Sequence, residues 1–178
     1  MYLKRSGNAN LKPITEVVVE KMGEKFVLVT IKNNYEDKDL LNDSPYYWRL
    51  VMESINPPLE ISLNRESGQI QEITFFISEE DINEKQELSC KKINENTLID
   101  TDLFVEYNYY NDTEGKYSVY FENRSLVCIF DNQIPSNISI SNENISYLFN
   151  DKGNLIGFLV NNLNTTALDV LKESSLLI

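Results

Sequence analysis

The chain contains no histidine, and this absence removes several of the most common kinds of active site. Histidine is the usual general base near neutral pH, the partner in Ser-His and Cys-His nucleophile pairs, and a frequent zinc ligand. The six glycines are scattered, so the sequence also lacks a glycine-rich phosphate loop. The groups that remain for catalysis are carboxylates.

Cysteine is scarce, with Cys90 and Cys128 as the only two. They do not form a C-x-x-C pair, which argues against thiol-redox and zinc-ribbon sites. Two cysteines are too few for a disulfide scaffold, so we expect both to be free thiols in a reducing cytosol. Cys128 lies within the apolar run 126–130, which places it in the expected core.

Long apolar runs and basic residues are also missing. The sequence predicts no transmembrane helix, and residues 1–7 lack the apolar segment of a signal peptide, so we expect a cytoplasmic protein. There are 16 basic and 28 acidic residues, for a formal net charge of −12. Nucleic acid and anionic membranes attract basic surfaces, so we expect neither as a partner. Opposite charge would steer a basic protein toward the chain; alternatively, the charge serves only solubility.

The 178 residues are 42% hydrophobic, which suits one compact domain or two small packed ones. β-Branched runs predict strands at 14–20 and 26–32 around a turn at Gly23, with Val27, Val29 and Ile31 facing the core. Residues 1–13 look like a loose arm or an edge strand, and 46–55 favour a strand over a helix. Further strands are expected at 98–99, 103–110, 116–122, 125–130 and 138–140, with a turn at 111–115.

Two helices are expected. Ser78 to Asp81 resembles a capped helix start, followed by a linker that runs through residue 96. Asn164 or Thr165 caps a short final helix with Ala167 on its apolar face. The expected fold is therefore α+β, predominantly antiparallel β, with a short C-terminal helix.

Two similar hairpins, at 59–77 and 144–160, suggest an internal repeat. They turn at Gly68 and Gly153, and the glycine turn and strand that begins at Phe26 match those at Tyr117. We interpret these matches as a tandem duplication of a β-rich unit, 1–92 followed by 93–178. The alternative is that any antiparallel protein shows such turn-strand matches.

The second hairpin also carries Tyr147, an Asp151 and Gly153 turn, and a hydrophobic step at Gly157. In these features it resembles a small uncharacterised bacterial β-hairpin family. The resemblance covers about a tenth of the chain, and it implies no activity. The glycine stands two positions after the aspartate here, where the family has three.

The candidate contact residues form an acidic group and an aromatic group. Acidic side chains crowd the segment between the two units, and aromatic residues favour interface centres. We expect partner contacts from Glu79, Glu80, Asp81, Glu84, Glu87, Tyr46, Trp48, Tyr107 and Tyr109. A solvated linker and simple core packing are the alternatives.

No metal or other cofactor is expected. Asp100 with Asp102, and Asp37 with Asp39, each place two carboxylates on one side of an extended chain. Neither pair has the further ligands of a calcium loop, so solvated loops are the better interpretation.

The favoured function is that of a non-catalytic, acidic protein-binding module. Its concrete form is a bacterial immunity-like inhibitor that covers a basic toxin or nuclease with carboxylates in place of substrate phosphates. The alternatives are a carboxylate-dependent enzyme, with or without an assisting metal, and a structural subunit that forms a homodimer through an exposed β edge. A monomer remains equally open.

Overall fold

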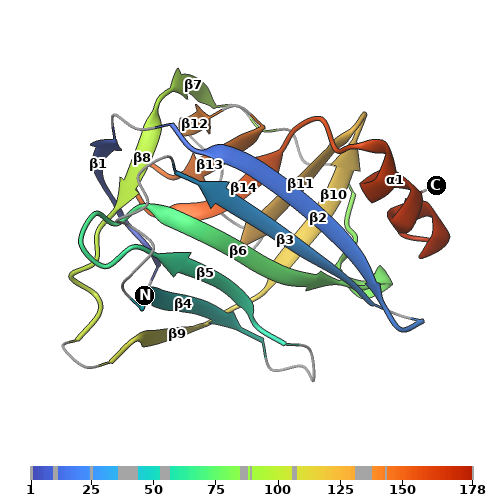
Figure 1. Ribbon diagram of the computed structural model, residues 1–178, viewed down its shortest axis with the longest axis horizontal. Coiled ribbons are helices and arrows are strands. Elements are labelled where there is room, and N and C mark those ends of the chain that lie inside the picture. The colour runs from blue at the N-terminus through green and yellow to red at the C-terminus, as the bar shows by residue number, and fades with distance from the viewer. Residues whose placement is uncertain are drawn as a thin grey trace.

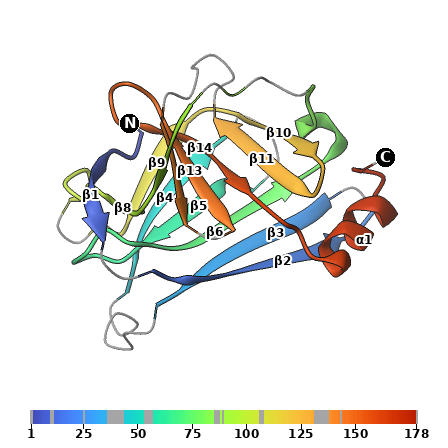
Figure 2. The ribbon, with the colours of Figure 1, turned by 90° about the horizontal axis from the view of Figure 1, so that it is seen from above.

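The computed structural model describes residues 2–9, 12–24, 26–35, 44–52, 57–84, 88, 90–105, 108–130, 138–142 and 144–177. Within these residues the chain forms two six-stranded sheets, a separate two-stranded sheet and one α-helix (Figure 1). Figure 2 shows the two large sheets as layers, with the helix at one end. None of the described helices could span a membrane.

The first sheet has six strands, of which all neighbours are antiparallel except the last pair. In spatial order its strands are β2 (Ile14–Met22), β3 (Phe26–Asn34), β6 (Ile70–Ile77), β5 (Leu59–Leu63), β4 (Tyr46–Val51) and β9 (Tyr110–Glu114). Strands β2 to β6 follow one another along the chain, whereas β9 arrives from much later and pairs in parallel with β4.

The second sheet repeats this arrangement. In spatial order its strands are β10 (Tyr117–Glu122), β11 (Ser125–Phe130), β14 (Leu155–Val160), β13 (Ile145–Phe149), β12 (Ile138–Asn142) and β7 (Lys91–Asn94). Here the sixth strand is β7, which precedes the other five along the chain and pairs in parallel with β12. The two-stranded sheet joins β1 (Arg5–Ala9) to β8 (Asn96–Ile99), the 3-10 helix η2 spans Glu79–Asp81, and α1 spans Thr165–Glu173.

The predicted fold class is confirmed, because the strands are mostly antiparallel and a short helix closes the chain. Val27, Val29 and Ile31 are fully buried, as their alternation along the strand predicts. The segment 46–51 is a strand, and Cys128 is buried in the core. The Asn164 side chain caps α1 by accepting a 2.8 Å hydrogen bond from the Ala167 backbone N–H.

Two expectations about the middle of the chain are wrong. The strand expected at 103–110 begins at Tyr110 and continues through the residues expected to turn, as far as Glu114. The expected linker through residue 96 contains β7 and part of β8. Both β7 and β9 lie at sheet edges and are rich in polar residues, so their backbones pair while many side chains meet solvent.

The two sheets share one hydrophobic core. Phe75 of the first sheet meets Phe158 of the second, with ring centroids 5.3 Å apart. Trp48 is fully buried and lies 5.6 Å from Phe130, again between ring centroids. Edge-on and tilted ring contacts of this kind add to the stabilisation from buried apolar area. The two layers are therefore held together by contacts between the predicted units.

Strand order and register are the same in both large sheets. One row across the first sheet passes through paired residues Val17, Ile31, Ile73, Ile61, Trp48 and Asn111. The corresponding row of the second sheet passes through Val119, Cys128, Phe158, Tyr147, Ile140 and Ile93. In both sheets the register shifts beside this row, between Ser62 and Leu63 and between Leu148 and Phe149.

The two predicted hairpins occupy equivalent places, since β5 with β6 corresponds to β13 with β14. Gly68 and Gly153 both have positive φ, at 71° and 75°. The proposed match of Phe26 with Tyr117 is wrong, because Phe26 begins the second strand of its sheet and Tyr117 the first. A tandem duplication, and a boundary between residues 92 and 93, stay predictions.

Backbone hydrogen bonds tie each hairpin turn to a strand from the other half. The Arg5 N–H donates to Gly153 O at 2.9 Å, and the Ile99 N–H donates to Gly68 O at 2.8 Å. Arg5 and Ile99 also pair with each other between β1 and β8. The small sheet therefore links the two hairpins at one end of the molecule.

Candidate functional site

The acidic segment, residues 79–84, lies between β6 and β7 and contains η2. The side chains of Glu79, Glu80 and Glu84 are exposed. No hydrogen bond or ion pair is formed by these three carboxylates with the described residues. Within the described part of the chain they therefore form an exposed acidic surface, and a contact with a partner stays a prediction. Glu87 lies outside the described residues.

Asp81 differs from its acidic neighbours, because its side chain is buried. Its Oδ2 accepts hydrogen bonds from the Ser78 N–H at 2.8 Å and from Ser78 Oγ at 2.7 Å. These bonds satisfy polar groups at the start of η2, as the capped-helix interpretation of this segment anticipates. Asp81 thus shapes the acidic segment and does not take part in its exposed face.

Trp48 does not fit the surface role expected of it. Its side chain is fully buried, and its Nε1–H donates to Thr113 Oγ1 at 2.9 Å. Strand alternation explains the position, because Trp48 and Leu50 face the core and the intervening Arg49 faces outward. The ring binds β4 to β9 and the first sheet to the second.

Tyr46 and Tyr109 form an aromatic cluster at one end of the first sheet, with Phe104 and Arg65. Tyr46 stacks on Phe104 with ring centroids 4.4 Å apart. The Arg65 guanidinium lies 5.2 Å from the Tyr46 centroid and 5.1 Å from that of Tyr109. Much of each tyrosine's surface is occupied within the molecule, although Tyr109 remains partly open to solvent. Tyr107 lies outside the described residues.

Tyr47 and Tyr110, which were not among the candidate residues, form a second aromatic pair, on the strands β4 and β9. Their rings stack with centroids 5.1 Å apart, and the Arg49 guanidinium lies 4.7 Å from the Tyr110 centroid. Arg49 also binds both carboxylate oxygens of Asp112, at 2.7 and 2.9 Å. Because side chains alternate along a strand and Trp48 faces the core, the sequence indicates that Tyr47 faces away from it. The parallel pairing of Tyr47 with Tyr110 has no local sequence signal.

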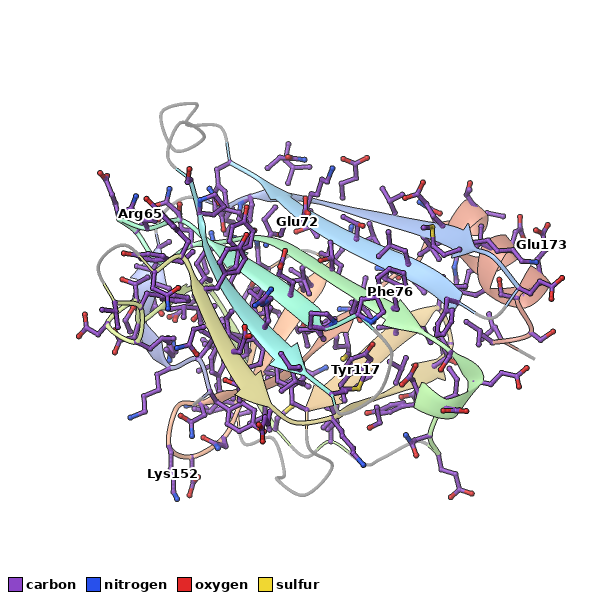
Figure 3. The ribbon with its side chains drawn as sticks, turned by 90° about the horizontal axis from the view of Figure 1, so that it is seen from below. Arg65, Glu72, Phe76, Tyr117, Lys152 and Glu173 are labelled. Atoms are coloured by element: carbon purple, nitrogen blue, oxygen red, sulfur yellow. The ribbon has the colours of Figure 1, made fainter. Side chains whose placement is uncertain are left out.

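Two carboxylates lie near this group on the neighbouring strands of the first sheet. Glu60 and Glu72 lie on the adjacent strands β5 and β6. Burial raises the pKa of Glu60, Arg49 lowers it and Glu72 raises it again. Figure 3 shows Glu72 along β6, with Arg65 at the turn before that strand. Lys32 pairs with Glu72 at 3.8 Å, so the arrangement is that of a surface charge network.

The described residues offer little for metal or thiol chemistry. They contain no group of three or more His, Cys, Asp or Glu side chains placed to hold a metal ion. Asp100 Oδ1 accepts a 2.9 Å bond from the Asp102 N–H, an ordinary turn contact. Asp37 and Asp39 lie outside the described part of the chain. Burial raises the pKa of the Cys128 thiol well above its usual value, with a further contribution from Asp81, so the thiol stays protonated.

A groove of about 640 Å³ lies between the outer edge of β2 and the start of α1. Its apolar lining comes from β2 and from the segment around the start of the helix, including Val17, Val19, Leu163 and Ala167. Five of its polar lining residues are asparagines: Asn34, Asn144, Asn161, Asn162 and Asn164. Among the described residues of the lining, Glu16 is the one that carries a charge. This combination of apolar and amide groups suits a polypeptide better than a charged small molecule.

Sequence reasoning missed the groove, because its walls come from segments more than a hundred residues apart. The abundant asparagines near residue 161 were a visible signal, but nothing local indicates that they face β2. No protein-family model matches this chain, and no curated protein matches it significantly.

Proposed function

We propose that the chain is a non-catalytic protein-binding module that docks on a basic protein, in the manner of an immunity-like inhibitor of a basic toxin or nuclease. The observation that supports it is the acidic segment: Glu79, Glu80 and Glu84 are exposed and have no basic partner among the described residues. Three neighbouring carboxylates repel one another, and a basic partner would relieve that repulsion.

The net charge of the whole chain, −12, also favours a basic partner. A long-range field of one sign speeds the encounter with an oppositely charged protein, and salt weakens this effect. Local carboxylates then fix which part of the surface is covered. On a nuclease, such carboxylates would occupy the places where substrate phosphates bind.

The test is capture of a partner from the organism that encodes the chain, followed by affinity measurements with the purified partner. A basic protein should bind in a stoichiometric complex whose affinity falls as salt rises. The triple variant Glu79→Lys, Glu80→Lys and Glu84→Lys should weaken binding by about a hundredfold, since each contact charge commonly contributes about a factor of five.

The matched control is the triple variant Asp102→Lys, Asp151→Lys and Asp169→Lys. It changes the net charge by the same amount at exposed positions outside the acidic segment. We expect it to weaken binding by no more than about fivefold, through the long-range field alone. Equal losses in both variants, or the absence of any basic partner, would contradict the proposal.

A further inference from the structure

The outer edge of β2 has no paired strand among the described residues. β2 is the first strand of its sheet, and in the described part of the chain its backbone makes ladder contacts only with β3. Ile14 at its start is 63% exposed. An unpaired edge offers N–H and C=O groups to an added strand, which is a common way to bind extended peptides.

The groove beside this edge offers amide groups that can bind a peptide backbone. The Asn164 side chain is used in capping α1, and Asn161 Oδ1 accepts a 3.4 Å bond from Ser125 Oγ. The side chains of Asn144 and Asn162 have no hydrogen-bond partner among the described residues. Each can donate and accept at once, which matches the donor and acceptor of a peptide group.

The second sheet shows what occupies the equivalent position. Val119 of β10 corresponds to Val17 of β2, because both begin the matching rows of paired residues. Beside Val119 runs an extended segment of the chain: Ile82 forms a parallel bridge with it, and the Asn83 N–H donates to Val119 O at 2.8 Å. In the second sheet, the edge of β10 is therefore bridged at Val119 by an extended segment in parallel orientation.

The corresponding segment of the second half takes a different conformation. After β6 the chain passes through η2 and becomes extended at Ile82. After β14 it reaches the Asn164 cap and forms α1, whose first turn lines the groove with Thr166 and Ala167. The helix packs against β2 but does not pair with its backbone. The groove beside β2 therefore lies at the position that corresponds to that of Ile82 and Asn83 beside β10.

We propose that the groove binds an extended, basic segment of the partner protein, which adds to β2 as a parallel strand. A branched aliphatic side chain takes the place beside Val17 that Ile82 takes beside Val119. A lysine or arginine of the segment pairs with Glu16, the charged residue of the lining. The inference rests on the proposed function and adds to it the binding site and the form of the bound segment.

Charge favours a basic segment over a second copy of the chain as the occupant of the groove. A dimer formed through two β2 edges would bring together Glu16 and Glu20 of both copies, each of which carries a net charge of −12. Like charges across a strand pair destabilise it. A basic segment in the groove instead meets Glu16, which has the opposite sign of charge.

The probe is a fluorescein-labelled peptide of eight alternating lysine and isoleucine residues, and the reference is its glutamate and isoleucine counterpart. Fluorescence anisotropy with the full chain should give a dissociation constant of about 10 to 100 μM for the basic peptide and at least about tenfold weaker binding for the acidic one. Amide NMR shifts on titration should concentrate at residues 14–19. Failure of the basic peptide to bind, or shifts that lie elsewhere, would overturn the inference.

Two pairs of variants locate the site. Thr166→Trp places a bulky ring in the groove and should weaken peptide binding at least about tenfold, whereas Thr165→Trp, exposed and outside the lining, should change it less than about twofold. Glu16→Lys should weaken binding about fivefold or more, and Glu20→Lys less than about twofold. Circular dichroism verifies that all four variants are folded. Equal effects within either pair would overturn the assignment.

The captured partner distinguishes this inference from the proposed function. If a basic protein binds wild type and Thr166→Trp equally well, the groove is not its site, and the proposed function stands alone. If the peptide binds in the groove but no basic protein is captured, the proposed function fails and the groove assignment remains. Dimerisation of the free protein that Thr166→Trp abolishes would identify a second copy as the occupant and overturn the inference.

Discussion

Trp48 and Phe130 belong to different sheets, yet their ring centroids lie only 5.6 Å apart in the shared core. Unfolding of either sheet would therefore expose apolar surface on the other. We expect one cooperative transition in urea. The fluorescence of Trp48, the only tryptophan, should report the same midpoint as the reaction of the Cys128 thiol, measured in a Cys90→Ser background. Two separate midpoints would show that the predicted units unfold independently.

A second prediction concerns the glycines of the equivalent hairpin turns. A Cβ at Gly68 would stand 2.0 Å from Ile99 O, whereas a Cβ at Gly153 would meet nothing within 4 Å. Gly153→Ala should lower the free energy of unfolding by about 1 to 2 kcal/mol, the cost of a positive φ for alanine. Gly68→Ala should cost more than about 4 kcal/mol, because backbone must also move. Urea denaturation of both variants measures the difference, and equal costs would contradict the steric explanation.

A third prediction concerns the buried hydrogen bond between Asn33 and Tyr147, which joins the two sheets. The Asn33 Nδ2–H donates to Tyr147 Oη at 2.8 Å. Burial, and then Tyr35, raise the pKa of Tyr147 far above its ordinary value, so this phenol stays neutral in the folded protein while the unfolded chain ionises. The contribution of the neutral Tyr147 phenol to the free energy of unfolding is therefore complete below about pH 10 and is lost progressively as pH rises above that value.

Tyr147→Phe should therefore be less stable than wild type by about 1 kcal/mol at pH 7. Above about pH 10 the difference in the free energy of unfolding between wild type and variant should shrink by up to about 1.4 kcal/mol per pH unit. The wild type loses stability as its unfolded chain ionises at this tyrosine, whereas the variant has no phenol there. Urea denaturation from pH 7 to pH 11 provides the measurement. Tyr110→Phe makes the same chemical change on an exposed ring, and a similar shrinkage in that control would count against burial as the cause.

A fourth prediction concerns the cap of α1, whose first turn lines the groove. Asn164→Ala removes the acceptor of the Ala167 N–H and should lower the free energy of unfolding by about 1 kcal/mol, whereas Asn164→Gly should cost only about 0.3 kcal/mol. Thermal unfolding of both variants tests this order. The helical circular dichroism signal should fall more in the alanine variant, and the reverse order would argue against the capping role.

Local patterns carried enough information for β2, β3 and α1. Alternation of Val27, Val29 and Ile31 indicates a strand with one buried face, and the Asn164 cap marks the helix start. β9 was missed because its sequence, Tyr-Asn-Asp-Thr-Glu, is polar and turn-like. It becomes a strand because β4 offers an unpaired edge and Trp48 a donor for Thr113, neither of which is near it in the sequence.

The candidate site shows the same limit. Exposure of Glu79, Glu80 and Glu84 could be expected from their charge, but burial of Asp81 depends on its bonds to Ser78. The groove depends on how the end of the second half passes β2, and on the register that makes Val17 equivalent to Val119. Such relations appear only once long-range pairing is known.

The parallel pairing of β4 with β9 has a consequence for folding during synthesis. Tyr47 pairs with Tyr110, so the first sheet lacks its sixth strand until residues 110–114 have left the ribosome. Until then β4 presents an open edge, with Tyr47 and Arg49 without their partners on β9. A nascent chain of this length is at risk of pairing with other chains. A pause before residues 110–114 have emerged would prolong that exposure, whereas a pause once they have emerged would allow the first sheet to close before the second is complete.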